Sequence, residues 1–237
     1  MFWIILSALL PVAILLFYIF RKDRRSPEPA GQLLKAFGWG LLSVPLSLCM
    51  SIPFGWAGLY PTEIHSFGGS IATAFFGAAI PEELAKLFVL WRFLRMNPYF
   101  DERMDGIVYA VCVSMGFAAL ENLMYVFQNS GDFLSVAVPR ALFSIPGHFS
   151  FGVLMGYYFS LVRFCPAGRP RNAMLMVAAP ILAHGLYDSI LFVMDVSPAL
   201  SGALMLVFLF FCFKLWRFGT RKIAEHLNDD ANPNNTI

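Results

Sequence analysis

Residues 105–127 read DGIVYAVCVSMGFAALENLMYVF, and this stretch decides the fold. Its charged residues are Asp105 at the start and Glu121 near the end. A run of about 20 apolar residues has the length of a helix that crosses the hydrocarbon core of a bilayer. In lipid, a helix satisfies its own backbone N–H and C=O groups. The stretch therefore predicts a transmembrane helix with a carboxylate inside it.

The rest of the chain repeats this pattern. The sequence of 237 residues is 58% hydrophobic and 14% charged, whereas soluble domains have about 25% charged residues. Further apolar runs are separated by segments with Pro, Gly, Asn and charged residues. We expect an all-α, polytopic membrane helical bundle of about seven transmembrane helices, in a single domain over residues 1–237. The predicted spans are 2–20, 37–58, 68–91, 105–127, 139–162, 172–194 and 199–217.

The basic residues predict the orientation of the bundle. Lys and Arg gather in every second connection, and Arg140 is the exception. Because cytoplasmic loops are rich in Lys and Arg, we expect the N-terminus outside and the C-terminus in the cytoplasm. No soluble basic patch with interleaved aromatic residues is found, so nucleic acid is not an expected partner. The basic segments are 21–35, 92–103, 163–171 and 214–222.

The ends of the chain differ in composition. The apolar residues 2–20 have no basic segment before them and no clear cleavage site, which predicts a first span that is retained. Residues 218–237 are predicted to be a cytoplasmic tail, disordered from Asn228 onward. His226 in this tail and His65 in an outer loop are expected to have no role.

Seven ionisable side chains fall inside four of the predicted spans. Each costs a few kcal/mol in the bilayer even on the mildest scale, so such residues indicate a functional site. They are Glu82, Glu83, Lys86, Glu121, His148, His184 and Asp188.

The span with two glutamates reads AAIPEELAKLF over residues 78–88. Glu82 and Lys86 are four residues apart and can pair on one helix face, while Glu83 points in another direction. Pro81 can kink the helix. The alternative interpretation is one buried ion pair, with the second carboxylate reaching the cytoplasmic side.

The two histidines stand in different contexts. His148 is followed by Gly152 and Gly156, whose spacing indicates either ordinary helix packing or a groove that leads a substrate helix to His148. His184 and Asp188 are one turn apart, and an aspartate beside a histidine fixes the tautomer of the ring.

These residues can meet only if the four helices form one bundle, as helices joined by short loops usually do. Counted along the spans, Glu82 lies about 10 Å closer to the cytoplasm than His148. A tilt, or a kink at Pro81, must close that gap.

The ordered motifs resemble the PrsW family of bacterial intramembrane proteases, which is related to the type II CAAX prenyl endopeptidases of the ABI superfamily. The likeness covers about residues 68–194, which would be the catalytic core. Relative to the CAAX branch, the second motif ends in Glu121 where those relatives have histidine. The motifs are Glu82-Glu83-x-x-Lys86, Phe117-x-x-x-Glu121, an isolated His148, and His184-x-x-x-Asp188.

The resemblance implies an endopeptidase of the bacterial cytoplasmic membrane. Its substrate would be a membrane-anchored protein, in the PrsW type a single-span anti-sigma factor, cut on its extracytoplasmic side as the first step of regulated proteolysis.

Peptide hydrolysis in a membrane requires a water molecule, a base that activates it and a group that stabilises the oxyanion. Glu82 or Glu83 could be the base. His148 and His184 could hold the water, or bind zinc or another divalent metal with Glu121 as third ligand. Asp188 would orient His184. Lys86 would neutralise one glutamate or help to stabilise the oxyanion.

Two other classes of function remain open. Chains of Glu, His and Asp in membranes also serve proton- or cation-coupled carriers, but we find no inverted repeat in the sequence. A non-catalytic membrane scaffold would gain nothing from buried charge.

Overall fold

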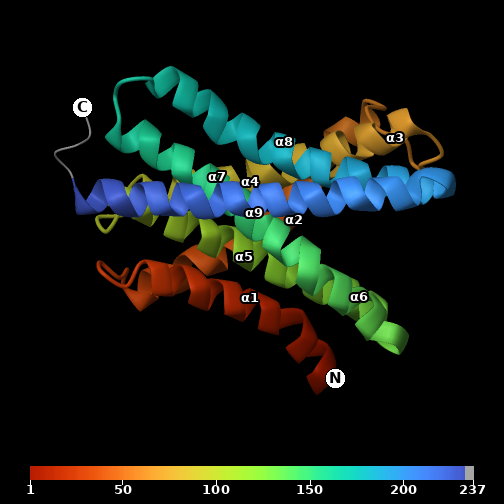
Figure 1. The fold of residues 1–237 in the computed structure, drawn as a ribbon, viewed down its shortest axis with the longest axis horizontal. Helices are drawn as coiled ribbons and strands as arrows, with labels where there is room; N and C mark the ends of the chain where they lie inside the picture. The colour runs from red at the N-terminus through yellow and green to blue at the C-terminus, as the bar shows by residue number, and fades with distance from the viewer. Residues whose placement is uncertain (233–237) are drawn as a thin grey trace.

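The computed structural model describes residues 1–232, which form helices and no strand. Figure 1 shows a bundle of long helices, with α9 running across the view in front of α5. The helices are α1 Phe2–Lys22, α2 Ala30–Trp56, α3 Phe67–Ala72, α4 Ile80–Leu94, α5 Arg103–Gln128, α6 Phe133–Pro139, α7 Ile145–Phe164, α8 Arg169–Val196 and α9 Ser201–Ala231.

The structure confirms the all-α polytopic bundle. Five helices are long and apolar enough to cross a membrane: α1, α2, α5, α8 and α9. Two further helical runs are interrupted by a π-helical segment, so that α3 continues into α4 and α6 into α7. Each of the seven predicted spans overlaps one helical run. The number of spans and the orientation stay predictions.

Each π-helical segment ends two residues before a proline. Thr73–Ala79 precedes Pro81 in α4, and Arg140–Ser144 precedes Pro146 in α7. Proline has no N–H to donate to the preceding turn, and a wider turn accommodates the break in the ladder. The irregularity predicted at Pro81 is thus a π segment, and it lies just before the two glutamates.

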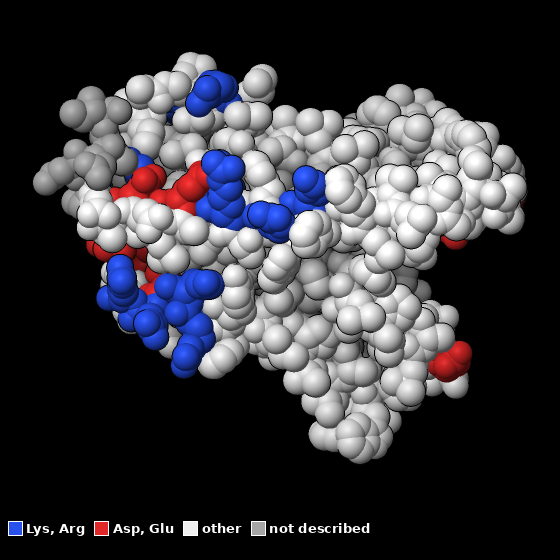
Figure 2. All heavy atoms as spheres, viewed as in Figure 1, with Lys and Arg blue, Asp and Glu red and all other residues white. Residues whose placement is uncertain are grey.

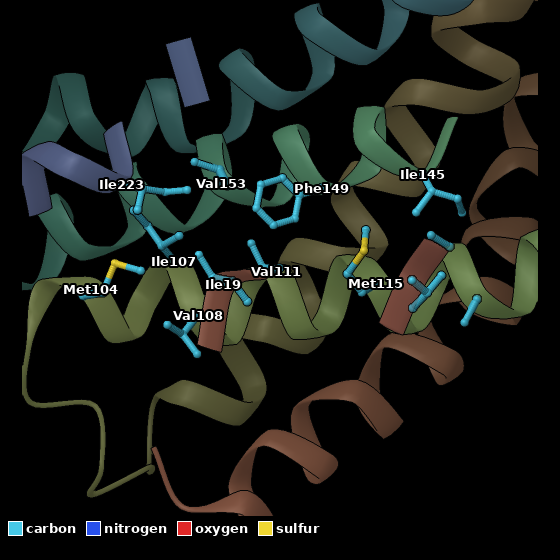
Figure 3. Close-up of a cluster of buried hydrophobic side chains, with 13 residues drawn as sticks. Ile19, Met104, Ile107, Val108, Val111, Met115, Ile145, Phe149, Val153 and Ile223 are labelled. Atoms are coloured by element: carbon cyan, nitrogen blue, oxygen red, sulfur yellow. The ribbon is translucent and has the colours of Figure 1, made fainter. Parts of the chain in front are cut away.

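Helix α5 is the centre of the bundle. In it, 78% of the membrane-length window is buried, against 17% in α1. It packs against α1, α2 and α7. Figure 3 shows Val111 of α5 near Phe149 of α7, with Ile19 of α1 beside them. Because neighbouring helices cover it on several sides, α5 is apolar nearly all round its circumference.

Glycines allow close approach of α5 to its neighbours. A Cβ on Gly156 of α7 would collide with the backbone of Gly106 and Ile107. A Cβ on Gly116 would collide with the backbone of Phe37 in α2. The glycine face of α7 is therefore filled by α5, and the alternative prediction of a substrate groove there is wrong.

The C-terminal end of α9 docks on the bundle. Asp230 accepts hydrogen bonds from the backbone N–H groups of Arg103 (3.0 Å) and Met104 (2.8 Å), which start α5. His226 is buried and stacks on Tyr157 at 4.4 Å between ring centroids. Residues 228–231 are helical, so the disorder predicted there is wrong. The remaining predicted tail, 233–237, lies outside the described residues.

The contact between α5 and α7 can be tested by adding one methyl group. We expect Gly156→Ala to lower the free energy of unfolding by about 1–3 kcal/mol, because the new Cβ has no room. Gly38→Ala in α2 is the control, since nothing lies within 4 Å of its Cβ position. The measurement is thermal unfolding in detergent micelles. Equal stability of the two variants would contradict the close approach.

Candidate active site

All seven ionisable residues converge in one place. They come from four helices: α4, α5, α7 and α8. The rings of His148 and His184 lie 5.5 Å apart, centroid to centroid, and Lys86 of α4 contacts His148 of α7. The gap predicted between Glu82 and His148 is therefore closed, with the π segments lying just before both residues.

Lys86 is fully buried and lies between two glutamates. Its Nζ donates to Oε1 of Glu83 at 2.8 Å and to Oε2 of Glu82 at 3.5 Å. The predicted pair with Glu82 is thus the longer of the two contacts. The ring of Phe117 lies 4.0 Å from the ammonium and adds a cation–π interaction. Both glutamates face the bundle, so the alternative in which one of them reaches the cytoplasmic side is wrong.

His148 bridges Lys86 and Glu121. Its Nδ1 is 3.2 Å from Nζ of Lys86, and its Nε2 is 3.0 Å from Oε2 of Glu121. Because an ammonium only donates, Nδ1 accepts from it. We therefore assign the ring proton to Nε2, which donates to Glu121. The lysine fixes the tautomer of this histidine.

His184 is held between two carboxylates. Its Nδ1 lies 2.9 Å from Oε1 of Glu83, and its Nε2 lies 3.2 Å from Oδ2 of Asp188. The ring of Phe151 stacks on it at 4.7 Å between centroids. The contact predicted between His184 and Asp188 is present, and together these groups fix the plane of the ring.

Arg140 is a site residue that the sequence analysis did not identify. It donates to Oε2 of Glu121 at 2.6 Å and to Oδ1 of Asn122 at 2.7 Å, and it lies over the ring of Tyr125. Asn122 in turn donates to the carbonyl of Ala8 at 2.8 Å. Arg140 was the exception in the distribution of basic residues, and that exception was the signal that could have identified it.

A cavity of about 390 Å³ opens beside these residues. Glu83 and Lys86 do not line it, and they lie behind the histidines. Met194 and Asp195 extend its wall to the last turn of α8. The site is therefore a polar surface at the base of a cavity that leads toward a helix end. The predicted residues that line it are Glu82, Glu121, His148, His184 and Asp188.

Comparison with known proteins identifies the family. The profile described as "PrsW family intramembrane metalloprotease" matches residues 28–215. The chain belongs to this family. Protease PrsW of Bacillus subtilis is 34% identical over 95% of this chain and 96% of its own length. Protease PrsW of Clostridioides difficile is 32% identical over 94% of this chain and 91% of its own length. No solved structure matches.

Membership in the PrsW family gives the chain its activity and its location. It is an intramembrane protease, a multi-pass protein of the bacterial inner membrane, and it acts on membrane-embedded protein substrates. The matched segment includes the core predicted at 68–194. Of the three classes of function considered, protease, carrier and scaffold, the family supports the protease.

The donor set fits the metal that the family description implies. Glu82, Glu121 and His148 each offer one ligand atom within 4.8 Å of the others, and Glu82, Glu83 and His184 form a second such group. The predicted trio of His148, His184 and Glu121 is not one of these groups. His148 is grouped with Glu82 and Glu121, whereas His184 is grouped with Glu82 and Glu83. Imidazole and carboxylate ligands beside an open cavity are typical of catalytic zinc sites.

The role of Lys86 can be tested by removing its charge. We expect Lys86→Met to lower the free energy of unfolding by about 3–5 kcal/mol, since it leaves Glu83 buried and charged without its ammonium partner. Adding Glu83→Gln should restore part of that loss. The exposed Lys214→Met serves as control. Thermal unfolding in detergent compares wild type, Lys86→Met, Glu83→Gln, the double variant and the control. An additive double variant would contradict the pairing.

Proposed function

We propose that this protease cuts a single-span membrane protein of the anti-sigma-factor kind near its extracytoplasmic side. The observation that supports this is the cavity, whose base is formed by residues able to activate water. The other support is the PrsW family, in which such substrates are expected from the resemblance described above.

The depth of the site supports cleavage toward the outer face. Glu121 lies about 27 Å along the helix axis from Arg103, where α5 begins, and about 10 Å from Gln128, where α5 ends. The Arg103 end carries the basic connections and is predicted to be cytoplasmic. A peptide bond at Glu121 would therefore lie in the outer half of the membrane.

Glu82 acts as the general base in this proposal, and Glu83 acts as a positioning residue. The side chain of Glu82 lines the cavity and is 15% exposed, whereas that of Glu83 is 1% exposed and contacts Lys86 and His184. A base must reach the water that it activates, and Glu82 meets that requirement. It takes a proton from water and returns it to the leaving amine.

Glu121 and His148 would hold a divalent metal such as zinc, and binding would displace the proton that Nε2 of His148 otherwise donates to Glu121. Bound there, the metal would polarise the scissile carbonyl. Both residues line the cavity, with Glu82 beside them. Arg140 is the cation that faces the cavity, so it is better placed than the enclosed Lys86 to stabilise the oxyanion. Asp188 orients His184 on the opposite wall.

Cleavage by purified variants tests the base. With a panel of single-span membrane proteins, we expect Glu82→Gln to slow cleavage by about 10²–10⁴-fold, the usual contribution of a general base. Glu83→Gln should retain part of the activity. Glu63→Gln, which removes an exposed loop carboxylate, should cleave as fast as wild type. Full activity in Glu82→Gln would remove it from the mechanism.

Metal content tests the ligand assignment separately. A strong chelator should abolish cleavage by wild type, and added zinc should restore it. Glu121→Gln and His148→Asn should purify with little bound metal, whereas Glu82→Gln should retain metal and remain inactive. Loss of metal from Glu82→Gln would instead make Glu82 a ligand, contrary to the proposal.

A further inference from the structure

A second group of carboxylates lies at the opposite end of α5 from the cavity. Glu28 belongs to the connection between α1 and α2, Asp101 to the connection between α4 and α5, and Asp105 to the first turn of α5. Each offers one oxygen within 4.8 Å of the other two. Figure 2 shows most of the acidic surface of that face at this end of the molecule.

Asp105 has one satisfied oxygen and one that lacks a partner. Its Oδ2 accepts from the backbone N–H groups of Asp101 (3.0 Å) and Glu102 (2.6 Å). Its Oδ1 is buried, and no N–H or hydroxyl group of the described residues donates to it. The side chain of Glu28 lies within hydrogen-bonding reach of Asp105, but two ionised carboxylates can only accept. A buried carboxylate oxygen without a donor is costly, because it has lost its water and gained nothing in return.

The surrounding charges leave the group short of cations. No Lys or Arg among residues 1–232 forms an ion pair with Glu28, Asp101 or Asp105, and the neighbouring Arg103 is paired with Asp229 at 2.6 Å. The hydroxyl of Tyr109 donates to Glu28, which satisfies one oxygen without adding charge.

A further carboxylate, Asp23, adds to the negative potential. Burial, together with the nearby charges of Glu28, Glu102 and Asp230, raises the pKa of Asp23 to about 7. Burial is the larger cause of this rise in the pKa, and the neighbouring carboxylates add to it.

We infer that Glu28, Asp101 and Asp105 bind a divalent cation of the hard, oxygen-preferring class, such as Mg²⁺. Three carboxylates supply the oxygen ligands that such cations prefer, and the exposed Asp101 leaves room for coordinating water. The cation would satisfy Oδ1 of Asp105. It would also tie two connections to the start of the central helix, so this site is structural and independent of the proposed catalytic mechanism.

The test uses the purified full-length protein with Mg²⁺ in thermal unfolding and Mn²⁺ in electron paramagnetic resonance. Mg²⁺ should raise the unfolding temperature of wild type by a few degrees, because a cation that binds the folded state stabilises it. Asp101→Asn should weaken Mn²⁺ binding at this site at least about tenfold. Its side chain is exposed, so folding should survive the change.

Controls separate this site from the catalytic one. The charge-matched Glu63→Gln and the cavity variant His148→Asn should both keep the response to Mg²⁺. The inference would be overturned if Mg²⁺ did not raise the unfolding temperature of wild type. It would also be overturned if Mg²⁺ raised the unfolding temperature of Asp101→Asn and Glu28→Gln as much as that of wild type.

Discussion

The active site depends on one buried ammonium. Lys86 is enclosed by protein, and a charge there is tolerable only with partners at short distance. Its three partners are Glu83, Glu82 and, across the bundle, Nδ1 of His148. The last contact joins α4 to α7 and leaves the proton of His148 on the nitrogen that faces Glu121. Lys86 therefore positions Glu82 and His148, which line the cavity, although it does not line the cavity itself.

Two departures from regular helix geometry accompany these contacts. Glu82 follows Pro81 in α4, and His148 follows Pro146 in α7. A π segment precedes each proline. On the other side, Gly106 and Gly116 let α5 approach α7 and α2 closely. Carboxylates and imidazoles have short side chains, so they meet across helices only where the backbones come close together.

The sequence predicted the helices and the seven site residues because apolar length and buried charge are local signals. It did not identify Arg140, since a single arginine near a span end is usually a loop residue and only its contact with Glu121 reveals its role. It left open what packs on Gly156, because small residues at four-residue spacing look the same whether a substrate or α5 fills the face. The docking of His226 depends on long-range packing that no local pattern records.

The balance of charge around the cavity favours a divalent cation. Four carboxylates meet there, from Glu82, Glu83, Glu121 and Asp188, against two permanent cations, Lys86 and Arg140. In an apolar bundle the remaining two negative charges need compensation. Protonating both histidines would supply it but would remove the lone pairs that a ligand or a base requires. A divalent metal supplies positive charge without adding a proton to His148, so the excess of carboxylates is itself a physical reason for a metalloprotease.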